Sequence, residues 1–250
     1  MNEQPLLQLH HASCFDVLSE LPDASIDALI TDPPYATTCL PWDKRIDWPA
    51  FWQQAHRVCK PTAVMAMFSA QPFTTELINS NRKYFRYEII WAKTMATGWL
   101  NANRRPLSGH ENILIFSRLP SGSTYNPQKS AGTPYKSRAH KTECALYTTG
   151  RMTDINNTTG ERHPKTWMVF QHDSKRGLHP TQKPVPLMRH LVLSYTNPGD
   201  VVLDPFAGSG STGVACLENQ RRFIGIEKEP DYFERAKTRL EEIVKARRND

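Results

Sequence analysis

A glycine-rich loop between an apolar run and a helical pattern constrains the fold of this chain most. The apolar run covers 201–203 and ends at Asp204. The loop that follows fits the pattern G-x-G-x-x-G through three glycines: Gly208, Gly210 and Gly213. Glycine permits a tight turn and lets the backbone approach a ligand closely. Since a helical pattern and a second apolar run over 222–227 follow, the segment predicts a strand–helix–strand unit of a parallel sheet with a nucleotide-like ligand at its loop.

The rest of the chain repeats this alternation of strand and helix patterns. Short apolar runs predict strands over 26–31, 63–68, 84–92 and 112–116. Helical patterns cover 47–59, 71–80 and 185–195, and a final helix opens at Pro230. Strands separated by helices predict an α/β fold with a mostly parallel, doubly wound sheet that carries helices on both faces.

The glycine pattern alone leaves two ligands open, a nicotinamide dinucleotide and S-adenosylmethionine. Two details favour the second. Pro205, Phe206 and Ala207 separate the strand from the glycines, so the loop offers an apolar side chain where a pyrophosphate binder offers bare amides. Asp204 brings negative charge, which suits a sulfonium or ammonium group and repels a diphosphate. A P-loop is excluded because Ser211, and not lysine, follows Gly210.

The tetrapeptide Asp32-Pro33-Pro34-Tyr35 follows the predicted strand 26–31 and suits chemistry on an amino group. An exocyclic amine of a base is a poor nucleophile because its lone pair is delocalised into the ring. The Asp32 carboxylate and the Pro33 carbonyl can each accept one amino hydrogen, which supports positive charge developing on the nitrogen. Two prolines have no amide hydrogens to compete, and Tyr35 offers a face for stacking on a flipped base. The alternative is a simple strand-terminating turn, which the glycine loop downstream disfavours.

Positive charge is concentrated in the middle of the chain. Residues 101–190 hold 14 Lys and Arg against 5 Asp and Glu, whereas the remainder holds 17 against 20. Regular periodicity also disappears over 118–176, although aromatic side chains such as Tyr125, Tyr135, Tyr147 and Trp167 are interspersed there. A basic, aromatic-containing segment predicts a surface that contacts phosphates, and 118–176 is the best candidate for contact with DNA. A solvated or disordered loop is the alternative.

Other features exclude several classes of protein. The five cysteines show no paired spacing, which argues against a disulfide framework: Cys14, Cys39, Cys59, Cys144 and Cys216. The amino terminus shows no basic-then-apolar leader, and no apolar run reaches membrane-spanning length. The histidines form no ligand pattern, so we expect no metal. These observations predict a cytoplasmic protein that is not associated with a membrane.

The tetrapeptide and the glycine loop, in this order, resemble the permuted (beta) class of amino-methylating DNA methyltransferases. The segment 179–184, His-Pro-Thr-Gln-Lys-Pro, is similar to a signature that lies just ahead of the cofactor strand in this family, and the blocks at 91–93 and 105–112 also resemble family blocks. The resemblance implies a Rossmann-like S-adenosylmethionine-dependent methyltransferase fold with circularly permuted motif order. It divides the chain into a catalytic half at 1–117, a target-recognition insert at 118–176 and a cofactor-binding half at 177–250.

The resemblance also implies the residues of the site. The tetrapeptide Asp32, Pro33, Pro34 and Tyr35 is then catalytic. S-adenosylmethionine is bound by Ser13, Asp32, Thr181, Lys183, Asp204, Phe206, Gly208, Gly210, Ser211, Thr212 and Glu227, with Thr181 and Lys183 at the methionine carboxylate and Glu227 at the ribose. The chain departs from the usual pattern at two positions. Ser13 replaces an aspartate, which predicts weaker cofactor binding than in typical relatives, and Ala36 replaces a glycine after the tyrosine.

The predicted function is methylation of adenine N6 at specific sites in double-stranded DNA, because aspartate as the first residue of the tetrapeptide fits adenine enzymes best. Cytosine-N4 enzymes, which more often carry serine there, share the same geometry and are the main alternative. A DNA-binding relative that has lost catalysis and an RNA amino-methyltransferase are two further alternatives. The family is associated with restriction–modification, and its members often form homodimers, so a homodimer is an additional expectation.

Overall fold

The chain forms two compact units in the computed structural model, which describes residues 5–37, 43–138, 154–171 and 182–248. The larger unit comprises Met1–Asn126 and Thr166–Asp250, and the smaller comprises Pro127–Lys165. The smaller unit contains a short antiparallel pair, β6 (Tyr135–Ser137) and β7 (Ile155–Asn157). There, the guanidinium of Arg162 lies 4.5 Å from the centre of the Tyr135 ring. The predicted insert at 118–176 is thus wider than this unit.

An eight-stranded sheet forms the centre of the larger unit among the described residues, with the order β1-β10-β9-β2-β3-β5-β4-β8. Its strands are β1 (Leu7–His11), β2 (Ile26–Thr31), β3 (Cys59–Ser69), β4 (Phe85–Thr97), β5 (Ser108–Ser117), β8 (Trp167–Phe170), β9 (Val201–Asp204) and β10 (Arg222–Glu227). All neighbouring strands pair in parallel except β5, which runs antiparallel to both β3 and β4. The sheet is therefore mostly parallel, as predicted.

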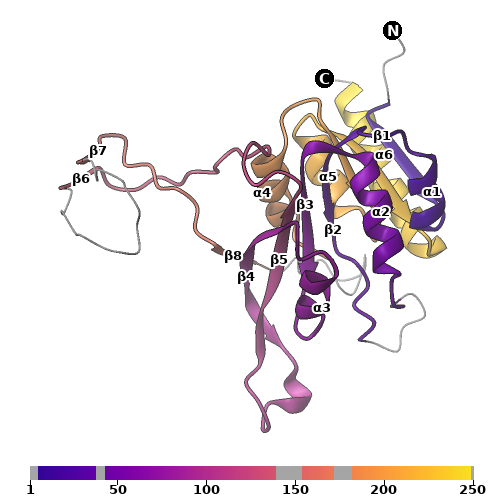
Figure 1. The fold of residues 1–250 in the computed structure, drawn as a ribbon, viewed down its shortest axis with the longest axis horizontal. Helices are drawn as coiled ribbons and strands as arrows, with labels where there is room; N and C mark the ends of the chain where they lie inside the picture. Colours follow the sequence, from indigo (N-terminus) through magenta and orange to yellow (C-terminus); the bar gives the residue numbers. More distant parts are fainter. Residues whose placement is uncertain (1–4, 38–42, 139–153, 172–181, 249–250) are drawn as a thin grey trace. The chain divides into compact units, whose positions relative to one another are not determined.

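Helices cover both faces of this sheet (Figure 1). One face carries α1 (Cys14–Glu20), α2 (Trp48–Val58) and α3 (Phe73–Ser80); the other carries α4 (Val185–Tyr195), α5 (Ser211–Glu218) and α6 (Pro230–Arg248). The arrangement follows from the pleat, because successive strand residues point to opposite faces. Leu29 and Leu203 belong to the first core, whereas Ile30 and Val202 belong to the second. The predicted doubly wound α/β fold is confirmed.

Local sequence signals explain where the helices begin. The Asp47 carboxylate accepts a hydrogen bond of 3.1 Å from the Ala50 amide and so caps α2, whose first turn also contains a proline. Phe51, Ala55 and Val58 then recur at three- and four-residue spacing and are fully buried. The bounds of this helix fall within one residue of the predicted range.

Two strands of the eight-stranded sheet were not predicted from the sequence. β1 is short and only partly buried along its length, so it has neither a continuous apolar run nor a clean alternation. β8 lies inside the segment without periodicity, yet it pairs in parallel with β4 from Ile90↔Trp167 to Lys93↔Phe170. Both lie at the edges of the sheet, where burial on one side only leaves a weak signal in the sequence.

The order of the strands determines where the two sequence motifs meet. β2, which ends just before Asp32, pairs in parallel with β9, which ends at Asp204, through the partners Ala28↔Val202 and Leu29↔Leu203. Because the carboxyl ends of parallel strands lie at the same edge of a sheet, the tetrapeptide and the glycine loop are neighbours there. Crevices at this edge are the usual ligand sites of doubly wound sheets.

The third glycine of the loop is required by packing. A Cβ atom on Gly213 would lie 2.7 Å from Cε1 of Phe223 and 2.9 Å from Cδ1 of Leu240, both of which are buried. We expect Gly213→Ala to lower the free energy of unfolding by about 1–2 kcal/mol, since an overpacking cost of up to about 3 kcal/mol exceeds the gain of about 1 kcal/mol from the helix propensity of alanine.

Thermal unfolding of the two proteins measures this effect. Gly109→Ala is the matched control, because nothing lies within 4 Å of a Cβ at that position. We expect the melting temperature of the control to equal that of the wild type. A Gly213→Ala protein that melts no earlier than the control would contradict the packing account.

Candidate active site

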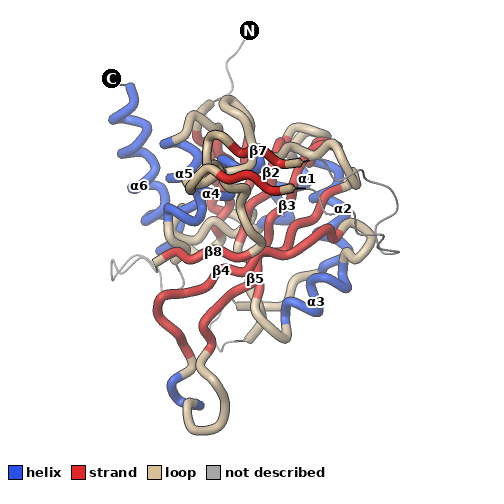
Figure 2. The backbone as a smooth tube through the Cα atoms, turned by 90° about the vertical axis from the view of Figure 1, so that its left-hand side faces the viewer, coloured by secondary structure: helices blue, strands red, loops and turns tan. Residues whose placement is uncertain are grey.

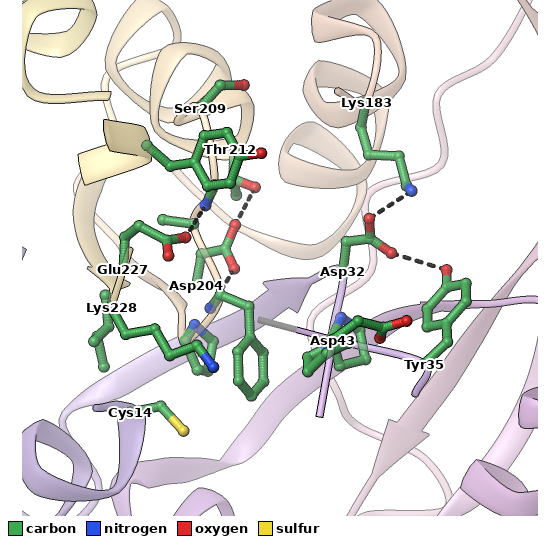
Figure 3. A pocket seen from close by; sticks show the side chains of 18 of the residues that line it. Cys14, Asp32, Tyr35, Asp43, Lys183, Asp204, Ser209, Thr212, Glu227 and Lys228 are labelled. Carbon is green, nitrogen blue, oxygen red and sulfur yellow. Dashed lines mark hydrogen bonds and ion pairs between the residues drawn. The ribbon is translucent and has the colours of Figure 1, made fainter. Parts of the chain in front are cut away.

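One cavity of about 470 Å³ opens at the carboxyl ends of β2, β9 and β10. Both motifs line it, the tetrapeptide at Asp32 and the glycine loop at Gly208 (Figure 3). The volume lies within the usual range of small-molecule sites, roughly 300–1,000 Å³. The two segments are far apart in the sequence but share a single site.

The Asp32 carboxylate is held from two sides. The Tyr35 hydroxyl donates to its Oδ1 at 2.8 Å, and the Lys183 ammonium lies 2.6 Å from its Oδ2 (Figure 3). Burial raises the pKa of Asp32 above its ordinary value, and the neighbouring Lys183 acts in the opposite direction. A carboxylate has about four lone-pair positions, so Asp32 keeps acceptor capacity for a further ligand.

Lys183 belongs to a row of alternating charges that we name the charge network: Asp32, Lys183, Glu111 and Lys93. The Lys183 ammonium lies 3.1 Å from Oε2 of Glu111, and the Lys93 ammonium lies 2.5 Å from Oε1 of Glu111. The side chains of both lysines are only 9% exposed. Burial raises the pKa of Glu111, but Lys183 and Lys93 outweigh it and hold that pKa below its ordinary value. The charges of the two ammonium groups in the network therefore balance those of the two carboxylates.

Tyr35 does more in the structure than offer a stacking face. Its ring stacks on Phe73 at 4.7 Å between ring centres with an interplanar angle of 20°, while its hydroxyl is held by Asp32. One face of the ring is thus covered by Phe73. Burial, together with the negative charge of Asp32, raises the pKa of Tyr35 well above its ordinary value, so the hydroxyl stays protonated and donates.

The turn after the tetrapeptide explains the glycine that relatives carry at position 36. Ala36 has a φ of +55°, in the left-handed region that favours glycine. The amides of Ala36 and Thr37 donate to the two carboxylate oxygens of Asp43 at 2.6 and 2.9 Å. These two bonds stabilise the turn in spite of the Cβ atom of Ala36.

Asp204 connects β9 to β2. Its Oδ1 accepts from the Thr31 hydroxyl at 2.6 Å and from the Phe206 amide at 3.1 Å, and its Oδ2 accepts from the Thr212 hydroxyl at 2.6 Å. Burial raises the pKa of Asp204 to about 6, although these three donors oppose the rise. The carboxylate that the sequence suggests for a cationic ligand is thus also the group that holds the loop between β9 and α5.

Glu227 holds the other side of the loop. Its Oε2 accepts from the Gly208 amide and its Oε1 from the Glu229 amide, each at 2.8 Å. Figure 3 shows the Glu227 side chain beside the cavity. Burial raises the pKa of Glu227. Each oxygen retains a lone pair, which leaves the side chain able to accept hydrogen bonds from a ligand hydroxyl.

Most of the residues expected at the cofactor and catalytic sites line the cavity: Ser13, Asp32, Pro33, Pro34, Tyr35, Lys183, Asp204, Phe206, Gly208, Ser211, Thr212 and Glu227. Ser13 also caps α1, since its hydroxyl accepts from the Phe15 amide at 3.3 Å. Gly210 does not line the cavity; it has a φ of +77° and faces Ala236 and Leu240 of α6. Thr181 lies outside the described residues.

Sequence reasoning assigned no role to several residues that the structure brings to the site. Glu111 and Lys93 lie in blocks that resemble the family, but their pairing depends on the antiparallel register of β4 and β5, in which Trp91 faces Glu111. Asp43 and Thr31 are single polar residues with no motif around them. For Lys183, the methionine carboxylate remains a predicted partner, and the structure adds the carboxylates of Asp32 and Glu111 as contacts.

Within the described residues, no group of three or more His, Cys, Asp and Glu side chains is placed to hold a metal ion. The same part of the chain contains no helix that is both long enough and apolar enough to cross a membrane. Three cysteines lie in it, Cys14, Cys59 and Cys216, and all are buried free thiols.

Comparison with known proteins gives consistent matches over nearly the whole chain. A family model described as DNA methylase matches residues 26–238. The chain is 30% identical to the type II methyltransferase M.HpaI of Haemophilus parainfluenzae, over 92% of this chain and 73% of that protein. Both motifs lie inside the matched region.

Solved structures also match this chain over most of its length. A complex of M1.HpyAVI with SAM superposes with a TM-score of 0.61 at 27% identity and covers 93% of this chain and 99% of that one. The PvuII DNA methyltransferase, described as cytosine-N4-specific, gives a TM-score of 0.69 at 15% identity and covers 98% of this chain and 94% of that one. At 15% identity, the similarity to the PvuII DNA methyltransferase concerns the fold alone.

Proposed function

The chain belongs to the DNA methylase family of S-adenosylmethionine-dependent enzymes that act on adenine N6 or cytosine N4, and from this premise we propose that it methylates adenine N6 in double-stranded DNA. The observation that carries the proposal is the position of Asp32. Its carboxylate lies at the end of β2, in the same cavity as the 204–212 loop, and aspartate as the first residue of the tetrapeptide favours adenine.

The residues of the cavity fit the cofactor. The glycine loop supplies close backbone approach, Glu227 supplies acceptors for the ribose hydroxyls, and Asp204 supplies negative charge beside a cationic ligand. Lys183, Phe206, Ser211 and Thr212 complete the proposed binding set with Ser13. When bound, S-adenosylmethionine supplies a methyl group activated by its sulfonium.

Asp32 and Pro33 activate the target amine in this proposal. A flipped adenine presents two amino hydrogens, of which the Asp32 carboxylate accepts one and the Pro33 carbonyl accepts the other. The lone pair of the nitrogen is thereby drawn out of the ring. As the nitrogen gains the methyl group, positive charge develops on it, and Asp32 stabilises that charge and receives the proton that the nitrogen then loses. No covalent enzyme intermediate is needed, so positioning supplies most of the rate.

Lys183 is a positioning residue for Asp32 in this scheme. Its ammonium contacts Oδ2, which directs the remaining lone pairs of the carboxylate, and its charge favours the ionised form that accepts the amino hydrogen. Glu111 in turn contacts this ammonium, and Lys93 pairs with Glu111.

Recognition of the DNA sequence is assigned to residues 118–176. This segment holds ten Lys and Arg against four Asp and Glu, and such an excess of positive charge suits a surface that neutralises phosphates. Phosphate contacts set the register of a protein on the duplex, while side chains in the grooves read the bases.

Nucleoside analysis tests the choice of base. Unmethylated DNA is incubated with the protein and S-adenosylmethionine, digested to nucleosides and analysed by mass spectrometry. We expect N6-methyladenine and no N4-methylcytosine. N4-methylcytosine alone would end the adenine assignment while leaving the family intact.

The remaining alternatives have separate tests. Failure of the wild type to transfer tritium from labelled cofactor to any DNA would favour a DNA-binding relative that has lost catalysis. Competition between duplex DNA and structured RNA in the same assay tests an RNA substrate, and we expect the RNA to compete weakly.

A further inference from the structure

The hairpin formed by β4 and β5 extends past the rest of the sheet. Figures 1 and 2 show its two arms leaving the body of the larger unit, with the short helix η1 (Trp99–Asn101) at the far end. The last strand pair joins Thr97 and Ser108, so residues 98–107 form what we name the hairpin tip. None of the residues 98–107 lines the cavity that contains Asp32.

The hairpin begins beside the active site. β4 is parallel to β8 and antiparallel to β5, which is itself antiparallel to β3, so the carboxyl end of β4 lies at the same edge of the sheet as the end of β2. Lys93 and Thr97 of β4 line the same cavity as Asp32. The tip therefore extends from a strand that forms part of the wall of the cavity.

Large apolar side chains are exposed along this hairpin. Trp99 is 72% exposed, Leu100 is 100% exposed, and Met95, on the β4 arm, is 71% exposed. Apolar surface in water is unfavourable, and Trp and Leu grouped at one projecting end mark an interaction surface more often than single scattered residues do.

The tip has a defined shape. Within it, the amides of Asn101 and Ala102 donate to the carbonyls of Gly98 and Trp99 at 2.9 and 3.1 Å, and the Arg105 amide donates to the Asn101 carbonyl at 3.0 Å. Gly98 begins the turn with a φ of +92°, which favours glycine. The apolar side chains thus project from a hydrogen-bonded turn, which reduces the conformational entropy lost when they contact a partner.

The charge of the tip identifies the partner. Arg104 and Arg105 are exposed, and the sequence from Thr94 to His110 contains no Asp or Glu. Apolar wedges flanked by arginine are the combination that proteins insert between base pairs while neutralising the adjacent phosphates.

We propose that the hairpin tip inserts into the DNA duplex beside the flipped base, with Trp99 and Leu100 packing against the exposed bases and Arg104 and Arg105 contacting the phosphates. The proposal rests on the proposed function, because it concerns the same DNA substrate. Flipping removes one base from the stack, and side chains that fill the gap compensate for the lost stacking.

Two double variants and two controls test the proposal. Trp99→Ala/Leu100→Ala removes the wedge, and Arg104→Ala/Arg105→Ala removes the charges. Arg82→Ala/Lys83→Ala is the matched control for the charges, because these two exposed basic residues precede β4 at its opposite end. Leu6→Ala is the control for the wedge, since Leu6 is 43% exposed and lies just before β1 at the other edge of the sheet.

The measurements are tritium transfer from labelled S-adenosylmethionine to unmethylated DNA and anisotropy of a fluorescein-labelled duplex at several salt concentrations. We expect the wedge variant to lower transfer at subsaturating DNA by about tenfold or more. The charge variant is expected to reduce the slope of log affinity against log salt by about 1.8, or about 0.9 for each lost phosphate contact. Both controls are expected to match the wild type, and calorimetry is expected to give one cofactor affinity for all five proteins.

The outcomes separate this proposal from the proposed function. A wild type that methylates DNA while both tip variants match it would overturn the role of the tip alone. A wild type that transfers no methyl group to DNA would overturn the proposed function. Sedimentation velocity completes the test: if the wedge variant converts a dimer to a monomer and leaves DNA affinity unchanged, the tip contacts a second copy of the chain and the DNA proposal is wrong.

Discussion

Replacing Asp32 by Ala or Asn is expected to lower kcat for methyl transfer by about 10³-fold or more, because the variant cannot stabilise the charge that develops on the amine. Asn keeps one acceptor oxygen but loses the negative charge, and Ala loses both. Since the glycine loop is held by Asp204 and Glu227, neither substitution removes a contact that fixes that loop. Because Asp32 is also a predicted cofactor contact, calorimetry measures the cofactor affinity separately, and the loss in kcat is expected to persist at saturating cofactor.

Single-turnover transfer of tritium at saturating DNA measures this effect without a contribution from product release. Asp23→Ala is the control, because the Asp23 side chain is 77% exposed and pairs with Arg57 away from the cavity. An Asp32→Asn protein that keeps more than about a tenth of the wild-type rate would show that the carboxylate is not needed for charge stabilisation.

Replacing Lys183 by Met is expected to lower activity near neutral pH by about 10²-fold and to move the acid limb of the pH–rate profile upward. Activity requires ionised Asp32 in the proposed mechanism. Burial raises the pKa of Asp32 and Lys183 lowers it, so removal of the ammonium raises that pKa further. Part of the lost activity is then recovered as the pH rises, which a merely structural defect would not produce.

Glu111→Gln serves as the matched variant, because it is expected to shift the acid limb of the pH–rate profile in the opposite direction. Glu111 raises the pKa of Asp32 through its negative charge, so its neutralisation is expected to move the acid limb downward. Lys183→Arg keeps the charge and is expected to leave the position of the limb near that of the wild type. If Met at 183 and Gln at 111 shifted the limb in the same direction, the charge network would not control the ionisation of Asp32.

The parts of the fold that the sequence predicts best are buried on both sides. β2 and β10 have the predicted bounds, because a mostly apolar run stopped by polar residues, glycine or proline leaves little choice of position. β1 and β8 lie at sheet edges and carry no such run, and the antiparallel direction of β5 depends on the long hairpin that joins it to β4. The direction of a strand and its pairing at a sheet edge depend on the assembled sheet, so a local sequence pattern does not predict them.

The candidate site likewise contains residues that can be predicted from the sequence and residues that cannot. Asp32 and the 204–212 loop are predictable because their chemistry is expressed in consecutive residues. Glu111 and Lys93 are not, because their contacts join strands that meet only in the folded sheet. Gly210 shows a third case: its positive φ fits the predicted tight turn, but its position faces α6 and not the cavity.

The pairing of β1 with β10 and of β2 with β9 has a consequence for synthesis on the ribosome. The first strand of the chain has its partner at 222–227, and the strand that carries Asp32 has one of its partners at 201–204. Such distant pairings are slow to form, and here they wait until residues 201–227 have emerged. The tetrapeptide is therefore synthesised well before the glycine loop, and the cavity that both line is completed only after residues 222–227 have emerged.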